Sequence, residues 1–120
     1  MTFRRDKTLL VAAFALGIGW LLVMLARSPG VLLDDEITHA LISINAWRYP
    51  EALLDVWGRP GNTIAYMLPA LLGGLEGRRL FAIGLCALTA VLAVGLSRRF
   101  SVKAGWLVVL CFFFQPWIAE

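Results

Sequence analysis

The chain has 120 residues, of which 60% are hydrophobic and only 16% are charged, and its mean hydropathy is +0.78. An ordinary soluble domain is far less apolar, so this composition excludes the common classes of soluble protein. The formal net charge of +3 requires no nucleic acid partner, because basic residues at the cytoplasmic ends of membrane helices produce the same balance. We therefore expect an all-α, multi-pass membrane protein that contacts membrane lipid and binds no nucleic acid.

Three uncharged apolar runs predict transmembrane spans at residues 8–26, 80–97 and 104–119. The first two are roughly 18 to 19 residues long and can each cross about 30 Å of hydrocarbon at ~1.5 Å per residue. The third is marginal in length, and Gln115 and Pro116 near its end favour an exit from the helix there. The first run follows basic residues, as a signal peptide does, but it is too long and lacks a cleavage motif, which favours an uncleaved helix.

A fourth apolar stretch, residues 63–75, contains a proline and a Gly-Gly pair and is too short to span. We interpret it as a short half-inserted helix. If it does not span, six basic residues fall in two short inner segments, 1–7 and 98–103; if it does span, the second cluster moves outside. The positive-inside rule favours the first arrangement, with a cytoplasmic N-terminus and residues 27–79 on the outer face of the cell membrane.

The outer segment, residues 27–79, is the one sizeable polar region of a single membrane domain, residues 1–120. It holds six of the eight acidic residues and five of the eleven basic ones. Within it, Ile37, Leu41 and Ile44 recur with helical spacing, which predicts an amphipathic helix at about residues 36–48 that lies along the membrane surface.

Three consecutive acids, Asp34, Asp35 and Glu36, stand at the start of this helix. On a helix, His39 lies four residues after Asp35 and three after Glu36, so the imidazole and carboxylates can share one face. Such a face can supply a general base or hold a divalent ion. The simpler interpretation, that the acids only begin the helix and keep the loop outside, is equally consistent with the spacing, and a metal cofactor stays an open question.

Several outer arginines are suited to grip a phosphate at the level of the lipid headgroups, since the guanidinium fork matches phosphate geometry. Arg59 lies between Gly58 and Pro60 in a turn, and Arg78 and Arg79 precede the second span. Each of them alone is equally consistent with anchoring at the membrane interface. Acids and cations on one outer loop are what a lipid-phosphate substrate requires.

The segment from Leu33 to Ala40, directly after the first span, resembles the Asp-Glu motif in the first outer loop of the GT-C superfamily of membrane glycosyltransferases. The turn at residues 58–61 and the apolar stretch after it resemble the proline-containing juxtamembrane segment of that superfamily. Residues 78–99 are similar to its second transmembrane helix, and residues 115–120 to the start of its next outer loop. The resemblance covers nearly the whole chain in order.

The resemblance implies transfer of a sugar from a polyprenyl-phosphate-linked donor to a hydroxyl of a protein, lipid or glycan acceptor, as in protein O-mannosyltransferases and lipid A aminoarabinose transferases. Asp35 would be the general base and Glu36 its partner in orienting the acceptor or a metal, with Asp34 an extra acid that leaves the register open. His39, Arg59 and the Arg78-Arg79 pair would be substrate-binding residues.

Members of this superfamily have many more transmembrane helices, so we expect the chain to be an N-terminal portion and to be inactive alone. Two alternatives stay open. The chain could be a small non-catalytic membrane protein, an assembly or transport subunit that binds a partner through its outer loop. It could also belong to another class of enzyme that acts on lipid phosphates, in which case Arg59 would matter more than Asp35.

Overall fold

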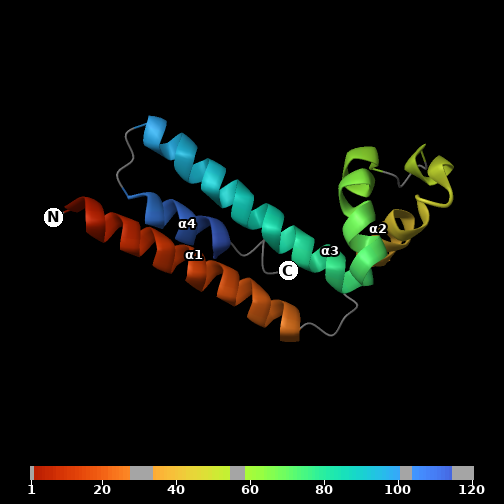
Figure 1. The fold of residues 1–120 in the computed structure, drawn as a ribbon, viewed down its shortest axis with the longest axis horizontal. Coiled ribbons are helices and arrows are strands. Elements are labelled where there is room, and N and C mark those ends of the chain that lie inside the picture. The colour runs from red at the N-terminus through yellow and green to blue at the C-terminus, as the bar shows by residue number, and fades with distance from the viewer. Residues whose placement is uncertain (1, 28–33, 55–58, 101–103, 115–120) are drawn as a thin grey trace. The chain divides into compact units, whose positions relative to one another are not determined.

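A computed structural model of the chain describes residues 2–27, 34–54, 59–100 and 104–114 (Figure 1), and at residues 2–5 and 34–36 it describes the helix but not the side chains. The described residues form helices and turns with no strand, which confirms the all-α prediction. The elements, in chain order, are α1 (Thr2–Arg27), α2 (Asp34–Asn45), the 3₁₀ helix η1 (Pro50–Leu54), α3 (Pro60–Arg99) and α4 (Gly105–Phe113).

Two helices of the described chain are long and apolar enough to cross a membrane, Asp6–Arg27 within α1 and Pro60–Arg99, which is α3. Only 17% and 11% of their most apolar windows are buried, whereas the core helix of a soluble protein is mostly buried. The predicted third span, residues 104–119, is a helix over the 9 residues of α4, which cover about 13 Å. Residues 115–120 lie outside the described chain, so the structure shows two helices of spanning length and not three.

The chain divides into two compact units. The first, which we call the three-helix unit, contains α1, α4 and the part of α3 from Ile83 onward. The second, which we call the elbow unit, contains α2, η1 and the part of α3 up to Ala82.

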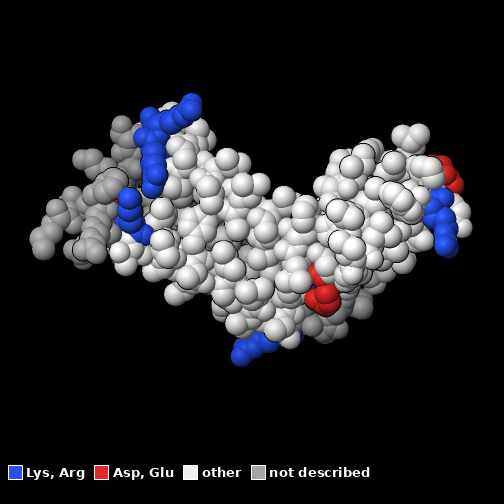
Figure 2. Space-filling model, viewed as in Figure 1, with Lys and Arg blue, Asp and Glu red and all other residues white. Residues whose placement is uncertain are grey.

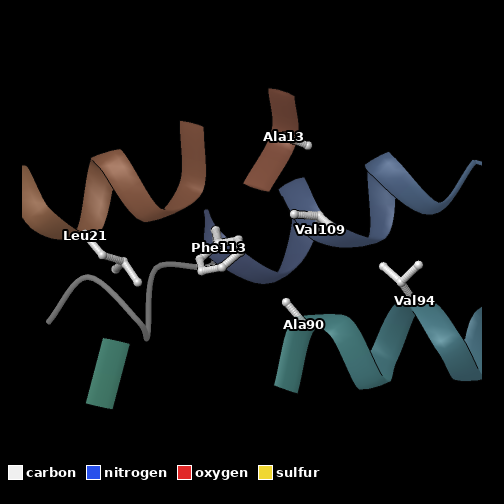
Figure 3. Close-up of a cluster of buried hydrophobic side chains, with 6 residues drawn as sticks. All are labelled: Ala13, Leu21, Ala90, Val94, Val109 and Phe113. Atoms are coloured by element: carbon white, nitrogen blue, oxygen red, sulfur yellow. The ribbon is translucent and has the colours of Figure 1, made fainter. Parts of the chain in front are cut away.

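The core of the three-helix unit combines small residues with one large aromatic side chain (Figure 3). Its fully or almost fully buried members come from all three helices and are Ala13, Leu21, Ala90, Val94, Val109 and Phe113. The Phe113 ring meets Phe14 edge-on, with the ring centroids 6.0 Å apart, and it lies against Gly17, where a Cβ atom would overlap it. Small residues let helix backbones approach closely, and Gly17 makes room for Phe113.

The contacts along α4 define its direction relative to α1. At the start of α4, a Cβ atom on Gly105 would lie 3.9 Å from Leu10 of α1. Further along both helices, Phe113 meets Phe14 and Gly17. Beyond them, the ring centroids of Phe114 and Trp20 are 6.0 Å apart. Positions increase together on both helices, so α1 and α4 are parallel. The part of α3 from Ile83 onward runs antiparallel to α1 and α4 (Figure 1). Three successive membrane crossings would require this alternation of direction.

The outer surface of the three-helix unit is apolar. Large hydrophobic side chains that are exposed on α1 and α3 include Val11, Leu16, Val23, Leu88 and Leu92. Figure 2 shows a broad white stretch over the middle of these helices, with Lys and Arg side chains beyond its ends. A monomeric soluble protein rarely exposes a continuous apolar surface of this kind.

In the elbow unit, α2 begins at Asp34 and ends at Asn45, earlier at both ends than the predicted range of 36–48. The backbone N–H groups of Arg48 and Tyr49 both donate to the carbonyl of Asn45, at 2.8 and 2.9 Å, and close the helix in a turn. Pro50 disfavours the helical conformation at Tyr49, so the helix does not resume after this turn.

A sharp kink divides α3 at Gly74, which has φ 56° and ψ −138°. Only glycine adopts this conformation readily. The first arm, residues 60–73, contains residues 63–73 of the predicted half-inserted stretch at 63–75. The second arm, residues 75–99, is about 37 Å long at ~1.5 Å per residue. The second arm alone is therefore long enough to cross a bilayer.

The tight contact between Gly17 and Phe113 generates a prediction with a matched control. Gly17→Ala places a Cβ atom against the Cβ, Cγ and Cδ2 atoms of Phe113, and we expect it to lower the unfolding free energy by about 1–3 kcal/mol. Gly19→Ala, on the same helix with open space around it, should raise stability by up to about 1 kcal/mol through helix propensity. SDS titration in mixed micelles measures both, and equal effects of the two substitutions would contradict the packing described.

Candidate functional site

The three consecutive acids form the first turn of α2, which is the next helix after α1 in the chain. Carboxylates are favoured at this end of a helix, because the unpaired N–H groups and the helix dipole make it electropositive. The side chains of Asp34, Asp35 and Glu36 lie outside the described part of the structure, which gives their position on the helix alone.

His39 lies on α2 one turn beyond Asp35, as the sequence predicted. Its side chain is half-buried, and its Nδ1 atom is buried with no hydrogen bond within the described chain. The hydroxyl of Ser43 donates to the backbone carbonyl of His39 at 2.7 Å and does not reach the imidazole ring.

α2 has one face of small buried residues, Ala40, Ser43 and Ala46, and Ser43 is fully inaccessible. The apolar side of the predicted amphipathic helix, which contains Ile37, Leu41 and Ile44, lies beside this face. Leu41 is exposed, and Ile37 and Ile44 are half-buried. The small residues hold α2 in its unit, while the larger apolar side chains keep part of their surface uncovered.

Arg59 is exposed and directly precedes α3. Its backbone carbonyl accepts the N–H of Thr63 at 2.8 Å, which is the first hydrogen bond of the helix. Pro60 occupies the first helical position, where a missing N–H has no cost. The Arg59 backbone is therefore fixed by the helix start, and its exposed side chain is accessible to a ligand.

Arg78 and Arg79 are much less accessible than Arg59. Arg78 is only 8% exposed, and its guanidinium lies 5.1 Å from the centroid of the Tyr66 ring. The Arg79 side chain is 10% exposed and faces Glu76 at 3.7 Å. The contact with Tyr66 joins Arg78 to the first arm of α3, and the pair with Glu76 lies within the second arm.

The sequence did not indicate that Tyr66 meets the second arm of α3. Its ring lies under the guanidinium of Arg78 and meets Phe81 edge-on, with the ring centroids of Tyr66 and Phe81 5.3 Å apart. These partners follow in sequence by more than three helical turns, so no local pattern links them. The Gly73-Gly74 pair was the available signal, but it marks only that a helix bends.

Among the side chains that the structure describes, no group of three His, Cys, Asp or Glu residues comes together as a metal site would. The acids at 34–36 are outside that set. Searches of protein-family models, curated proteins and solved structures found no match to this chain.

The contrast between Ser43 and Asn45 tests the buried face of α2. Both side chains donate to the carbonyl four residues earlier, at 2.7 and 2.8 Å, but Ser43 is fully buried and Asn45 is exposed. We expect Ser43→Leu to reduce the unfolding free energy by about 1–3 kcal/mol through overpacking. Asn45→Leu should change it by less than about 0.5 kcal/mol.

The same SDS titration measures both variants. A loss at Asn45→Leu as large as at Ser43→Leu would show that the face carrying Ser43 is not the packed one.

Proposed function

We propose that this chain is part of a GT-C-type membrane glycosyltransferase that uses a polyprenyl-phosphate-linked sugar donor. The observation that carries the proposal is the position of Asp34, Asp35 and Glu36 as the first turn of a helix that follows an apolar helix of spanning length. This is the placement that the resemblance of the acidic motif implies.

The proposed topology has three spans. α1 and the second arm of α3 cross the bilayer, and the segment at 104–119, of which α4 is the described part, crosses a third time. Lys7 lies near the start of α1, and Arg98 and Arg99 end α3, so the positive-inside rule supports a cytoplasmic side at these ends. α2 and the half-inserted first arm of α3 then lie at the outer face.

In the proposed reaction, Asp35 takes the proton of the acceptor hydroxyl, whose oxygen forms a bond to the anomeric carbon of the donor sugar. The bond between that carbon and the phosphate oxygen breaks, and polyprenyl phosphate leaves with the electron pair. Glu36 orients the acceptor or a metal, and Asp34 is an additional acid beside it. His39, one turn further along α2, is a substrate-binding residue. Arg59 binds the donor phosphate equally in the bound substrate and during its departure.

The burial of Arg78 and Arg79 changes their proposed role. Both were expected to bind the donor phosphate, but their contacts with Tyr66 and Glu76 support a role in shaping α3. The same observation favours the alternative of a non-catalytic membrane protein, because Arg59 is then the one predicted phosphate ligand whose described side chain is exposed.

Substitutions in the complete protein encoded by the gene test the function. Asp35→Asn should lower sugar transfer from a polyprenyl-phosphate donor by about 10²–10⁴-fold, since it removes the general base without changing shape. Arg59→Gln should raise the KM for the donor. The matched controls are Glu51→Gln and Arg48→Gln, which change exposed charges of the same unit, and both should keep wild-type turnover.

Undiminished turnover in Asp35→Asn would contradict the glycosyltransferase mechanism. If Arg59→Gln abolished activity while Asp35→Asn did not, the result would favour the phosphate-transferring class of enzyme.

A further inference from the structure

The two arms of α3 fold back on each other at Gly74. In a straight helix, residues 66 and 81 would be separated by about 22 Å along the axis, yet the rings of Tyr66 and Phe81 are 5.3 Å apart. Gly77 lies so close to the carbonyl of Pro69 that a Cβ atom on it would overlap that oxygen. Glycine at 74 permits the turn, and glycine at 77 permits the close approach.

Tyr66 is the residue of the first arm that contacts the second arm through two different interactions. Its ring face receives the guanidinium of Arg78 at 5.1 Å, and Phe81 meets the same ring at an interplanar angle of 85°. A cation over the ring face is attracted by the ring quadrupole, and this attraction strengthens when the pair is removed from water. Arg78 is 8% exposed, so the pair is largely removed from water.

The ion pair between Arg79 and Glu76 is a weaker constraint on the bend. Both residues belong to the second arm, so the pair does not join the two arms, and Glu76 is 63% exposed. Solvent screens such pairs strongly. The contacts of Tyr66 with Arg78 and Phe81, in contrast, join the two arms.

We propose that Tyr66 and Arg78 form a latch that holds α3 folded at Gly74 and thereby positions Arg59. The first arm begins directly after Arg59, whose carbonyl accepts the first hydrogen bond of that arm. The direction of the arm thus determines where the Arg59 side chain points. Tyr66 and Arg78 are positioning residues, and this part of the inference rests on the proposed role of Arg59 as phosphate ligand.

Pulsed EPR distances test the latch without substrate. Spin labels replace the exposed side chains of Ile64 and Leu80 in the complete protein, after Cys86→Ala and Cys111→Ala remove the native thiols. The latched protein should give one narrow, short distance. Tyr66→Leu and Arg78→Gln should shift the distribution toward the roughly 24 Å backbone separation of a straight helix.

Conservative variants separate the latch from general damage to folding. Tyr66→Phe keeps the ring face and Arg78→Lys keeps a cation, so both should keep most of the short distance. Gly74→Ala should open the elbow because of its positive φ, whereas Gly73→Ala, with open space and no positive φ, should not. A short, narrow distance in both Tyr66→Leu and Arg78→Gln would overturn the latch.

Kinetics of the same variants test the positioning of Arg59. Tyr66→Leu should raise the donor KM about tenfold with little change in kcat, because an arginine that binds the phosphate equally before and during reaction acts through KM. If the distance lengthens while KM stays at the wild-type value, the positioning role is wrong and the latch stands. If wild-type protein shows no transfer at all, the proposed function fails and the EPR result still decides the latch.

Discussion

A helix satisfies its backbone hydrogen bonds internally, so it can cross hydrocarbon while apolar side chains face lipid, whereas charged side chains must stay near its ends. The long helices of this protein follow that constraint. α1 and the second arm of α3 expose rows of large apolar side chains and carry their basic residues at or near their ends. Water would penalise such a surface heavily at about 25 cal/mol per Å², and a bilayer would not. The acidic residues 34–36, in the first turn of α2, would likewise be penalised in hydrocarbon.

Packing between the helices uses small residues for the same reason. Lipid is as apolar as a leucine side chain, so helices associate in it through close fit and not through exclusion of water. Gly17 against Phe113 in the three-helix unit and Gly77 against the Pro69 carbonyl in the elbow unit are two examples. In the elbow unit, close approach also brings Tyr66 under Arg78.

The sequence predicted the apolar helices and the helical context of the acids, because helix formation and membrane insertion follow from local composition and spacing. It placed the end of α2 three residues too late, because the spacing of Ile37, Leu41 and Ile44 does not mark where the helix ends, whereas the turn hydrogen bonds to the Asn45 carbonyl do. It could not predict the fold-back at Gly74, since Gly-Gly marks flexibility and the direction of the bend depends on partners such as Tyr66 and Phe81. For the same reason the burial of Arg78 and its contact with Tyr66 could not be predicted from the sequence.

Cysteine accessibility in the complete protein tests the central claim, a membrane crossing between α2 and the end of α3, most directly. Single cysteines replace the exposed Asn45 of α2 and the exposed Phe100 that follows α3, with Cys86 and Cys111 changed to alanine, and a membrane-impermeant maleimide is added to either side of the membrane. The account predicts that Asn45→Cys is labelled from the outer side only and Phe100→Cys from the cytoplasmic side only. Labelling of both positions from the same side would contradict it.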